Sequence, residues 1–257
     1  MRKAFLMALV VVAATLVPAG TAAAAKSNTY TQAIHESWSE YKLDVIVVPP
    51  PHGQIYNSNG PLGGGDPAEA TPFNSYVAAV EDSVAQWDKV IDTKGPRWMR
   101  KTSIKTYVVG RDEIPESVQQ DPEAVIVYNE HQTFILGVTF SFSNMPAECL
   151  ISNSMFFLQS FNYTDMYSVN LHEFGHCLGL EHTVAENKDA TITHEMMAPA
   201  YPHDPGAAGT HFHCISNLNL KGVQLAFAEA FGRPRPNVNT ATVEMTPAQY
   251  RLYPCGR

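Results

Sequence analysis

The segment HEFGHCLGLEH, residues 172–182, constrains the fold of this chain more than any other part of its sequence. His172 and His176 are four residues apart. On an α-helix they therefore lie one turn apart on nearly the same face, and both imidazoles can reach one metal ion. His182 cannot reach that ion along a straight helix. We therefore expect Gly179 to end the helix with a positive φ angle, so that the chain turns back and His182 supplies a third ligand.

Three histidine nitrogens with an open fourth position are typical of a catalytic zinc ion, which activates a water and polarises a carbonyl. Glu173 lies about 100° round the helix from His172, so it need not bind the metal and can act as the general base. The pattern predicts hydrolysis of peptide bonds without a covalent intermediate. An ordinary buried helix is an alternative that the match at several fixed positions disfavours. A zinc site without catalysis is another, which the intact Glu173 disfavours.

The long apolar run of this chain lies at its N-terminus. Arg2 and Lys3 precede an apolar stretch at 5–17, and small residues with an A-x-A pattern follow. This order predicts a secretory signal peptide over residues 1–25, and therefore a secreted, extracellular protein. An uncleaved membrane anchor is the alternative, but it needs about 20 continuous apolar residues. We expect no membrane contact of the mature form.

The charge of the chain bears on its partners. There are 17 Lys and Arg residues against 25 Asp and Glu, and the basic residues form no cluster that could neutralise phosphates. We therefore expect no nucleic-acid partner. The net acidity is expected mainly to keep a secreted protein soluble.

Four cysteines, together with export to an oxidising compartment, indicate two disulfides. Three connectivities are possible, and we favour Cys177 with Cys214 and Cys149 with Cys255. Cys177 could instead be a zinc ligand or a reactive thiol. The histidines already supply enough ligands, which makes this alternative less favoured.

Hydrophobic periodicity predicts an α/β (α+β) domain with three main helices packed on a mixed, twisted, five-stranded sheet. The predicted strands cover residues 45–48, 102–110, 123–129, 134–142 and 148–157. The predicted helices cover residues 73–91, 163–178 and 216–231.

The remaining segments set the expected domain organisation. Residues 26–40 have no strong pattern and are interpreted as an N-terminal arm or a short pro-segment. The catalytic domain is expected over 41–232, and a Pro-rich tail over 233–257 is expected to pack on it. In the Gly-rich loop 52–72, Asp66 and the glycines could hold a calcium ion, but a plain loop is favoured.

The opening segment matches HExxHxxGxxH, so the chain resembles the metzincin zinc metallopeptidases. The segment HEMMAPAY, residues 194–201, is similar to the methionine turn of that clan. Met197 fits its M-x-P pattern better than Met196 does. HEFGH and M-x-P-x-Y resemble the matrixins most, in a bacterial-type secreted form. The resemblance implies a fold with zinc in a cleft, three histidine ligands and Glu173 as the base.

The resemblance also implies how a protein or peptide substrate binds in extended form. The segment FILGVTFSF should contain an antiparallel edge strand that pairs with the substrate backbone, and residues after Met197 should form the outer wall of a specificity pocket. The substrate-binding residues implied in this way are Pro199, Ala200, Tyr201, Gly137, Val138 and Thr139. We expect the enzyme to be a monomer.

Several features depart from the matrixin pattern. Thr183 stands where a serine is usual, and the loop 183–195 is longer. Pro199 occupies the position of a tyrosine ligand in astacin-like members, so a fifth ligand is not expected. No cysteine precedes Cys149, so latency cannot use the inhibitory cysteine of a matrixin pro-segment.

Further polar residues surround the methionine turn. His194 could contact substrate or be a solvated loop residue, and a neighbouring set could form a second metal site, although a polar loop is favoured. That set is His203, Asp204, His211 and His213. Two other functions remain as alternatives: a secreted zinc-binding protein without catalysis, and a zinc hydrolase of another amide such as a cell-wall peptide.

Overall fold

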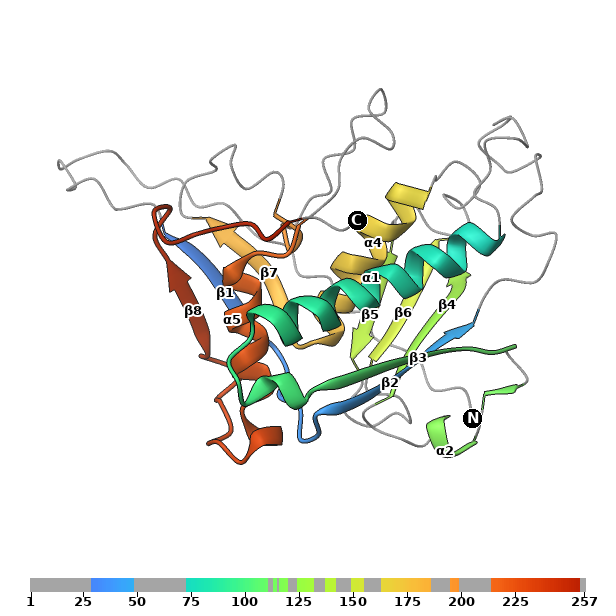
Figure 1. Cartoon of the computed structure of the whole chain (residues 1–257), viewed down its shortest axis with the longest axis horizontal. Coiled ribbons are helices and arrows are strands. Elements are labelled where there is room, and N and C mark those ends of the chain that lie inside the picture. The colour runs from blue at the N-terminus through green and yellow to red at the C-terminus, as the bar shows by residue number, and fades with distance from the viewer. Residues whose placement is uncertain are drawn as a thin grey trace, which may run out of the picture.

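The computed structural model describes the chain in ten stretches, which together form two sheets and their covering helices (Figure 1). The described residues are 29–48, 73–110, 113–114, 116–119, 124–131, 137–141, 149–154, 163–185, 195–198 and 214–254.

The larger sheet has five strands in the order β3-β2-β4-β6-β5. Strand β2 pairs in parallel with β3 and β4, and β4 pairs in parallel with β6, whereas β5 is antiparallel to β6 at one edge. The strands are β2 (Lys42–Val48), β3 (Ser103–Val108), β4 (Val125–His131), β5 (Gly137–Ser141) and β6 (Cys149–Ser154). The predicted mixed five-stranded sheet is confirmed.

Two long helices, α1 (Phe73–Lys94) and α4 (Tyr163–Cys177), pack against each other and against this sheet (Figure 1). Successive side chains of a strand point to opposite faces of the sheet, so every second residue faces the helices and forms the core with them. Val45 and Val47 of β2 face the main core, which includes both helices, while Ile46 belongs to a separate small cluster. The apolar stripe predicted for the first helix is largely buried there, from Tyr76 to Val90, with Val77 partly buried.

The third predicted helix is shorter than its apolar pattern suggested. Helix α5 (Asn217–Ala226) begins with a capping box between Ser216 and Asn219. The 3₁₀-helix η4 (Glu229–Phe231) follows, and Gly232 ends it with a φ of 69°. The short elements η1 (Met99–Lys101) and α2 (Glu116–Gln119) were not predicted.

A second sheet of three antiparallel strands, in the order β7-β1-β8, was also not predicted. Its strands are β1 (Tyr30–Ile34), β7 (Leu180–Ala185) and β8 (Thr242–Met245). These strands lack the usual alternation of buried apolar and exposed polar residues. The polar residues Gln32 and Thr183 are buried, whereas the apolar Val184 is 60% exposed. Both the N-terminal segment before residue 41 and the C-terminal segment after residue 232 therefore contribute strands to the fold.

The disulfide pairing that we favoured is wrong. Cys149 pairs with Cys177, with their Cα atoms 5.4 Å apart. Helix α4 runs back along the sheet after β6, so the first residue of the strand and the last residue of the helix meet. Cys214 is also disulfide-bonded, and Cys255 lies outside the described residues.

None of the helices in the described ranges has the length and apolar character needed to cross a membrane. The predicted signal peptide, residues 1–25, lies outside these ranges, as do Asp66 and the glycine-rich loop around it.

Candidate metal centre

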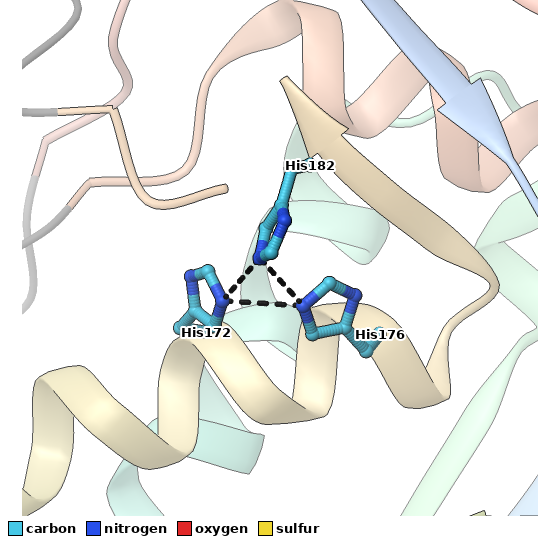
Figure 2. Close-up of side chains that lie close together, drawn as sticks. All are labelled: His172, His176 and His182. Carbon is cyan, nitrogen blue, oxygen red and sulfur yellow. Dashed lines mark hydrogen bonds between the residues drawn. The ribbon is translucent and has the colours of Figure 1, made fainter. Parts of the chain in front are cut away.

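Helix α4 carries His172 and His176 on one face, as their spacing predicts, and His182 approaches them from strand β7 (Figure 2). The three Nε2 atoms lie 3.2 to 3.3 Å from one another. Of the residues that the structure describes, these three histidines form the cluster suited to holding a metal ion. Two ligands therefore come from a helix on the larger sheet, and the third comes from the smaller sheet.

Gly179 makes this convergence possible, and its predicted positive φ angle is confirmed at 91°. This left-handed conformation is strained for residues with a side chain. A Cβ atom at this position would also lie only 2.9 Å from the carbonyl oxygen of Glu36 and 3.0 Å from Cβ of Ala226. The turn after α4 is therefore restricted to glycine both by its backbone angle and by the space around it.

Backbone carbonyls fix the orientation of two of the rings. Nδ1 of His172 lies against the carbonyl oxygen of Met196, and Nδ1 of His176 is 2.7 Å from the carbonyl oxygen of Leu180. A carbonyl oxygen only accepts hydrogen bonds, so Nδ1 must carry the proton in both rings. The Nε2 lone pairs are then free to bind a metal.

The spacing of the three nitrogens fits zinc. Tetrahedral coordination at Zn–N distances of about 2.0–2.1 Å places ligand nitrogens about 3.3–3.4 Å apart. The observed separations of 3.2 to 3.3 Å agree with this value. Lone pairs held this close repel one another unless a cation lies between them, so the arrangement suits a metal-binding site.

The surroundings favour the neutral form of the His176 and His182 rings, which is the form that binds metal. Burial lowers the pKa of His176 to about 3, and the neighbouring His172 adds to the shift, while the backbone hydrogen bond to Leu180 opposes it. Burial also lowers the pKa of His182, against the opposing effect of Glu181.

Glu173 lies next to the first ligand on α4 and is only 7% exposed. Burial raises the pKa of its carboxyl group to about 7, and a hydrogen bond from Thr139 opposes the shift. The Thr139 hydroxyl lies 2.6 Å from Oε2 of Glu173 and 3.1 Å from its carbonyl oxygen. A carboxyl group with a pKa near 7 is suited to exchange protons at neutral pH.

The turn of residues 195–198 packs directly against α4. Met196 and Met197 are both buried, and the backbone N–H of Thr183 donates to the carbonyl oxygen of Met197 at 2.7 Å. A Cβ atom at Gly175 would lie 2.5 Å from Sδ of Met197 and 3.3 Å from Cε of Met196. Both methionines therefore lie against the helix face at Gly175. Thr183 belongs to β7, so residues 183–185 of the expected loop form a strand.

A buried polar network behind this turn was missed by the sequence analysis. Glu195, immediately before the methionines, is fully buried, and burial raises its pKa to about 7 against the effect of surrounding hydrogen bonds. The Ser216 hydroxyl lies 3.3 Å from its Oε1. Asn219 and Gln32 continue the network to β1. No local sequence pattern marks this cluster, because its members come from distant segments.

Several predicted site residues lie outside the described ranges: Pro199, Ala200, Tyr201, His194, His203, Asp204, His211 and His213. Gly137, Val138 and Thr139 lie on β5, the edge strand of the larger sheet.

The three converging histidines, held by a helix and by the strand after a glycine turn, define a metzincin-type zinc site. A protein-family model described as matrixin matches residues 75–210, which is more than half of the 257-residue chain. The chain therefore belongs to the matrixin family of zinc metalloendopeptidases, as the resemblance implied. A comparison with curated proteins finds no match.

Proposed function

We propose that this protein is a secreted endopeptidase in which Glu173 is the general base. The observation that carries the proposal is the buried Glu173 carboxyl group beside three histidine Nε2 atoms at zinc-binding separation. Zinc bound by His172, His176 and His182 would supply Lewis-acid activation of a water molecule and of the substrate carbonyl.

The residues of the chain divide the remaining work. The carbonyl oxygens of Met196 and Leu180 hold the rings of His172 and His176 in the ligand orientation. Glu173 accepts a proton from the water that attacks the scissile carbonyl carbon. The same carboxyl group then gives this proton to the nitrogen of the breaking C–N bond, so it ends the cycle as it began. A pKa of about 7 supports both transfers.

The substrate is proposed to bind in extended form along β5. This strand lies at the edge of the larger sheet, and its described pairing is with β6. An edge strand can accept a further strand by backbone hydrogen bonds, which reads peptide shape rather than side chains. Gly137, Val138 and Thr139 would make this contact, and Pro199, Ala200 and Tyr201 would form the pocket wall.

Export and a monomeric state also belong to this proposal. The N-terminal pattern of residues 1–25 supports a cleaved signal peptide. The Cys149–Cys177 disulfide supports a destination in an oxidising compartment.

The test is cleavage of an unstructured protein by the mature chain, compared with Glu173→Gln, with zinc content measured in both. We expect the parent to cut, and the variant to bind zinc and to lose at least about a hundredfold in kcat. Glu244→Gln, on the exposed side of β8, is the matched control and should keep full activity. If parent and variant hold zinc and neither cuts, the binding-protein alternative gains. A parent that cuts only cell-wall peptides supports the other amide hydrolase.

A further inference from the structure

We infer that Thr139 is a positioning residue whose hydroxyl holds the Glu173 carboxyl group in the orientation needed for proton transfer. The inference rests on the proposed function, because it assigns a partner to the proposed base. It also assigns separate roles to the backbone and to the side chain of Thr139. Its backbone lies on the strand proposed to bind substrate, while its side chain contacts the base.

The geometry of the contact carries the inference. The Thr139 Oγ1 atom is 2.6 Å from Glu173 Oε2 and 3.1 Å from the Glu173 carbonyl oxygen. A hydroxyl has one proton, and the shorter contact, to the carboxyl oxygen, is the stronger when that group is ionised. The hydroxyl therefore binds one named oxygen of the base and leaves Oε1 for the water.

The fold directs the Thr139 side chain to this position. Thr139 pairs with Ile151 of β6, and Ile151 is part of the core between the sheet and the helices. Residues paired across antiparallel strands point to the same face of the sheet. Strand β5 also contacts α4, which carries Glu173. The side chain of Thr139 therefore points toward helix α4. Because threonine is β-branched, rotation about its χ1 angle is restricted.

Glu173 has a need for such a partner. A glutamate side chain has several rotatable bonds, and a base must lie within hydrogen-bond reach of the proton that it takes. Within the described stretches, Thr139 is the side chain that hydrogen bonds to the Glu173 carboxyl group. Loss of this contact should displace the base without removing it, and small displacements of catalytic groups cost up to about a hundredfold in rate.

The test compares Thr139→Val, which keeps the β-branched shape and the backbone, with Thr139→Ser, which keeps the hydroxyl. We expect the valine variant to lose about tenfold to a hundredfold in kcat with KM within about twofold of the parent. The serine variant should recover kcat to within about threefold. Thr106→Val is the matched control, since Thr106 is half-buried on β3 at the opposite edge of the same sheet.

A second comparison tests whether Thr139 acts through Glu173. In the Glu173→Gln background, Thr139→Val should lower the residual rate by less than about twofold, because the base that it positions is gone. Zinc content and Tm are measured for every variant. Thr139→Ala, which removes the hydroxyl without adding a methyl group, replaces valine if the latter disturbs folding.

The outcomes separate the inference from the proposed function. If the parent cuts, Glu173→Gln does not, and Thr139→Val retains the parent kcat, the inference is overturned and the proposed function stands. A serine variant as slow as the valine variant, or a loss confined to KM, also overturns it. A parent that cuts no peptide overturns both.

Discussion

Gly175 shows how one residue of the histidine motif is restricted by a contact far from it in sequence. The residue lies on α4 between Glu173 and His176, with a helical conformation that any residue can adopt. Its hydrogen atom faces Sδ of Met197, Cε of Met196 and the Trp87 ring. The missing side chain lets the turn of residues 195–198 approach the helix, and that turn supplies the carbonyl oxygen that orients His172.

We predict that Gly175→Ala weakens zinc binding and lowers stability. The added methyl group would meet the Met197 sulfur at 2.5 Å, so this buried side chain must shift within the turn that carries it. Overpacking of this kind costs about 1–3 kcal/mol in the free energy of unfolding. Denaturant unfolding and zinc titration against a competing chelator measure the two effects.

The control is Gly232→Ala. Gly232 has a φ of 69° but no atom within 4 Å of a built Cβ, so this change adds only backbone strain of about 1–2 kcal/mol. Its zinc affinity should equal that of the parent. Equal zinc affinity in Gly175→Ala would show that the turn does not depend on the close approach.

At the scale of elements, a buried polar network connects β1, β7, α5 and the turn before Met196. Gln32 Oε1 accepts hydrogen bonds from Thr183 at 2.9 Å and from Asn219 at 2.9 Å. The Asn219 side chain also caps α5 through Ser216, whose hydroxyl reaches Glu195. These groups are all buried, so each depends on its partners to replace water. The N-terminal strand thereby supports the turn behind the metal centre.

We predict that Glu195 makes stability depend on pH. Burial raises its pKa from 4.5 to about 7, so the folded state holds the proton more tightly than the unfolded state does. The protonated Glu195 carboxyl group therefore contributes to the free energy of unfolding. This contribution is fully present below pH 4.5 and is lost as the pH rises to about 7, by at most about 1.4 kcal/mol per pH unit.

The measurement is the free energy of unfolding of the parent and of Glu195→Gln between pH 5 and about pH 7.5. Subtracting the free energy of unfolding of the variant from that of the parent removes the effects of the other titrating groups. One of these is His176, whose lowered pKa makes stability increase with pH. We expect the parent to lose stability relative to the variant as the pH rises. A constant difference across this range would contradict the prediction.

The elements that could be predicted from sequence are those whose cause is local. Spacing alone gave the two ligands on α4 and the glycine turn to His182, because helix geometry and φ > 0 act within a few residues. The three-stranded sheet could not be predicted, because polar Gln32 and Thr183 occupy its buried positions and find their partners in distant segments. The predicted disulfide pairing was wrong for a similar reason, because the pairing depends on where α4 lies over β6, and no local pattern reveals this.

At the scale of the whole molecule, the metal centre takes its ligands from elements of both sheets, two from helix α4 and one from strand β7. Helix α4 packs against β5 and β6 of the larger sheet, and β7 of the smaller sheet carries the third ligand. A bound metal would therefore join the two parts of the fold. The Cys149–Cys177 disulfide provides a covalent link in the same region, because Cys177 follows the ligand His176 directly and Cys149 begins β6.

We predict that this disulfide stabilises both the fold and the metal centre. Cross-linking residues separated by 28 positions should contribute about 3–4 kcal/mol to the free energy of unfolding, mainly by restricting the unfolded chain. Peptide mapping without reduction should recover Cys149 linked to Cys177. It should also find Cys214 linked to Cys255, the remaining cysteine of the chain.

The paired variant Cys149→Ser with Cys177→Ser tests the contribution to the metal centre. Without the link, the end of α4 loses its covalent connection to the sheet, so His176 is positioned less firmly. We expect a lower denaturant midpoint and faster loss of zinc to a chelator. Glu244→Gln, on the exposed side of β8, is the control, because it leaves the disulfide and the contacts of α4 intact. Should both variants lose zinc at the same rate, the Cys149–Cys177 bond has no special effect on the site, and its role is confined to overall stability.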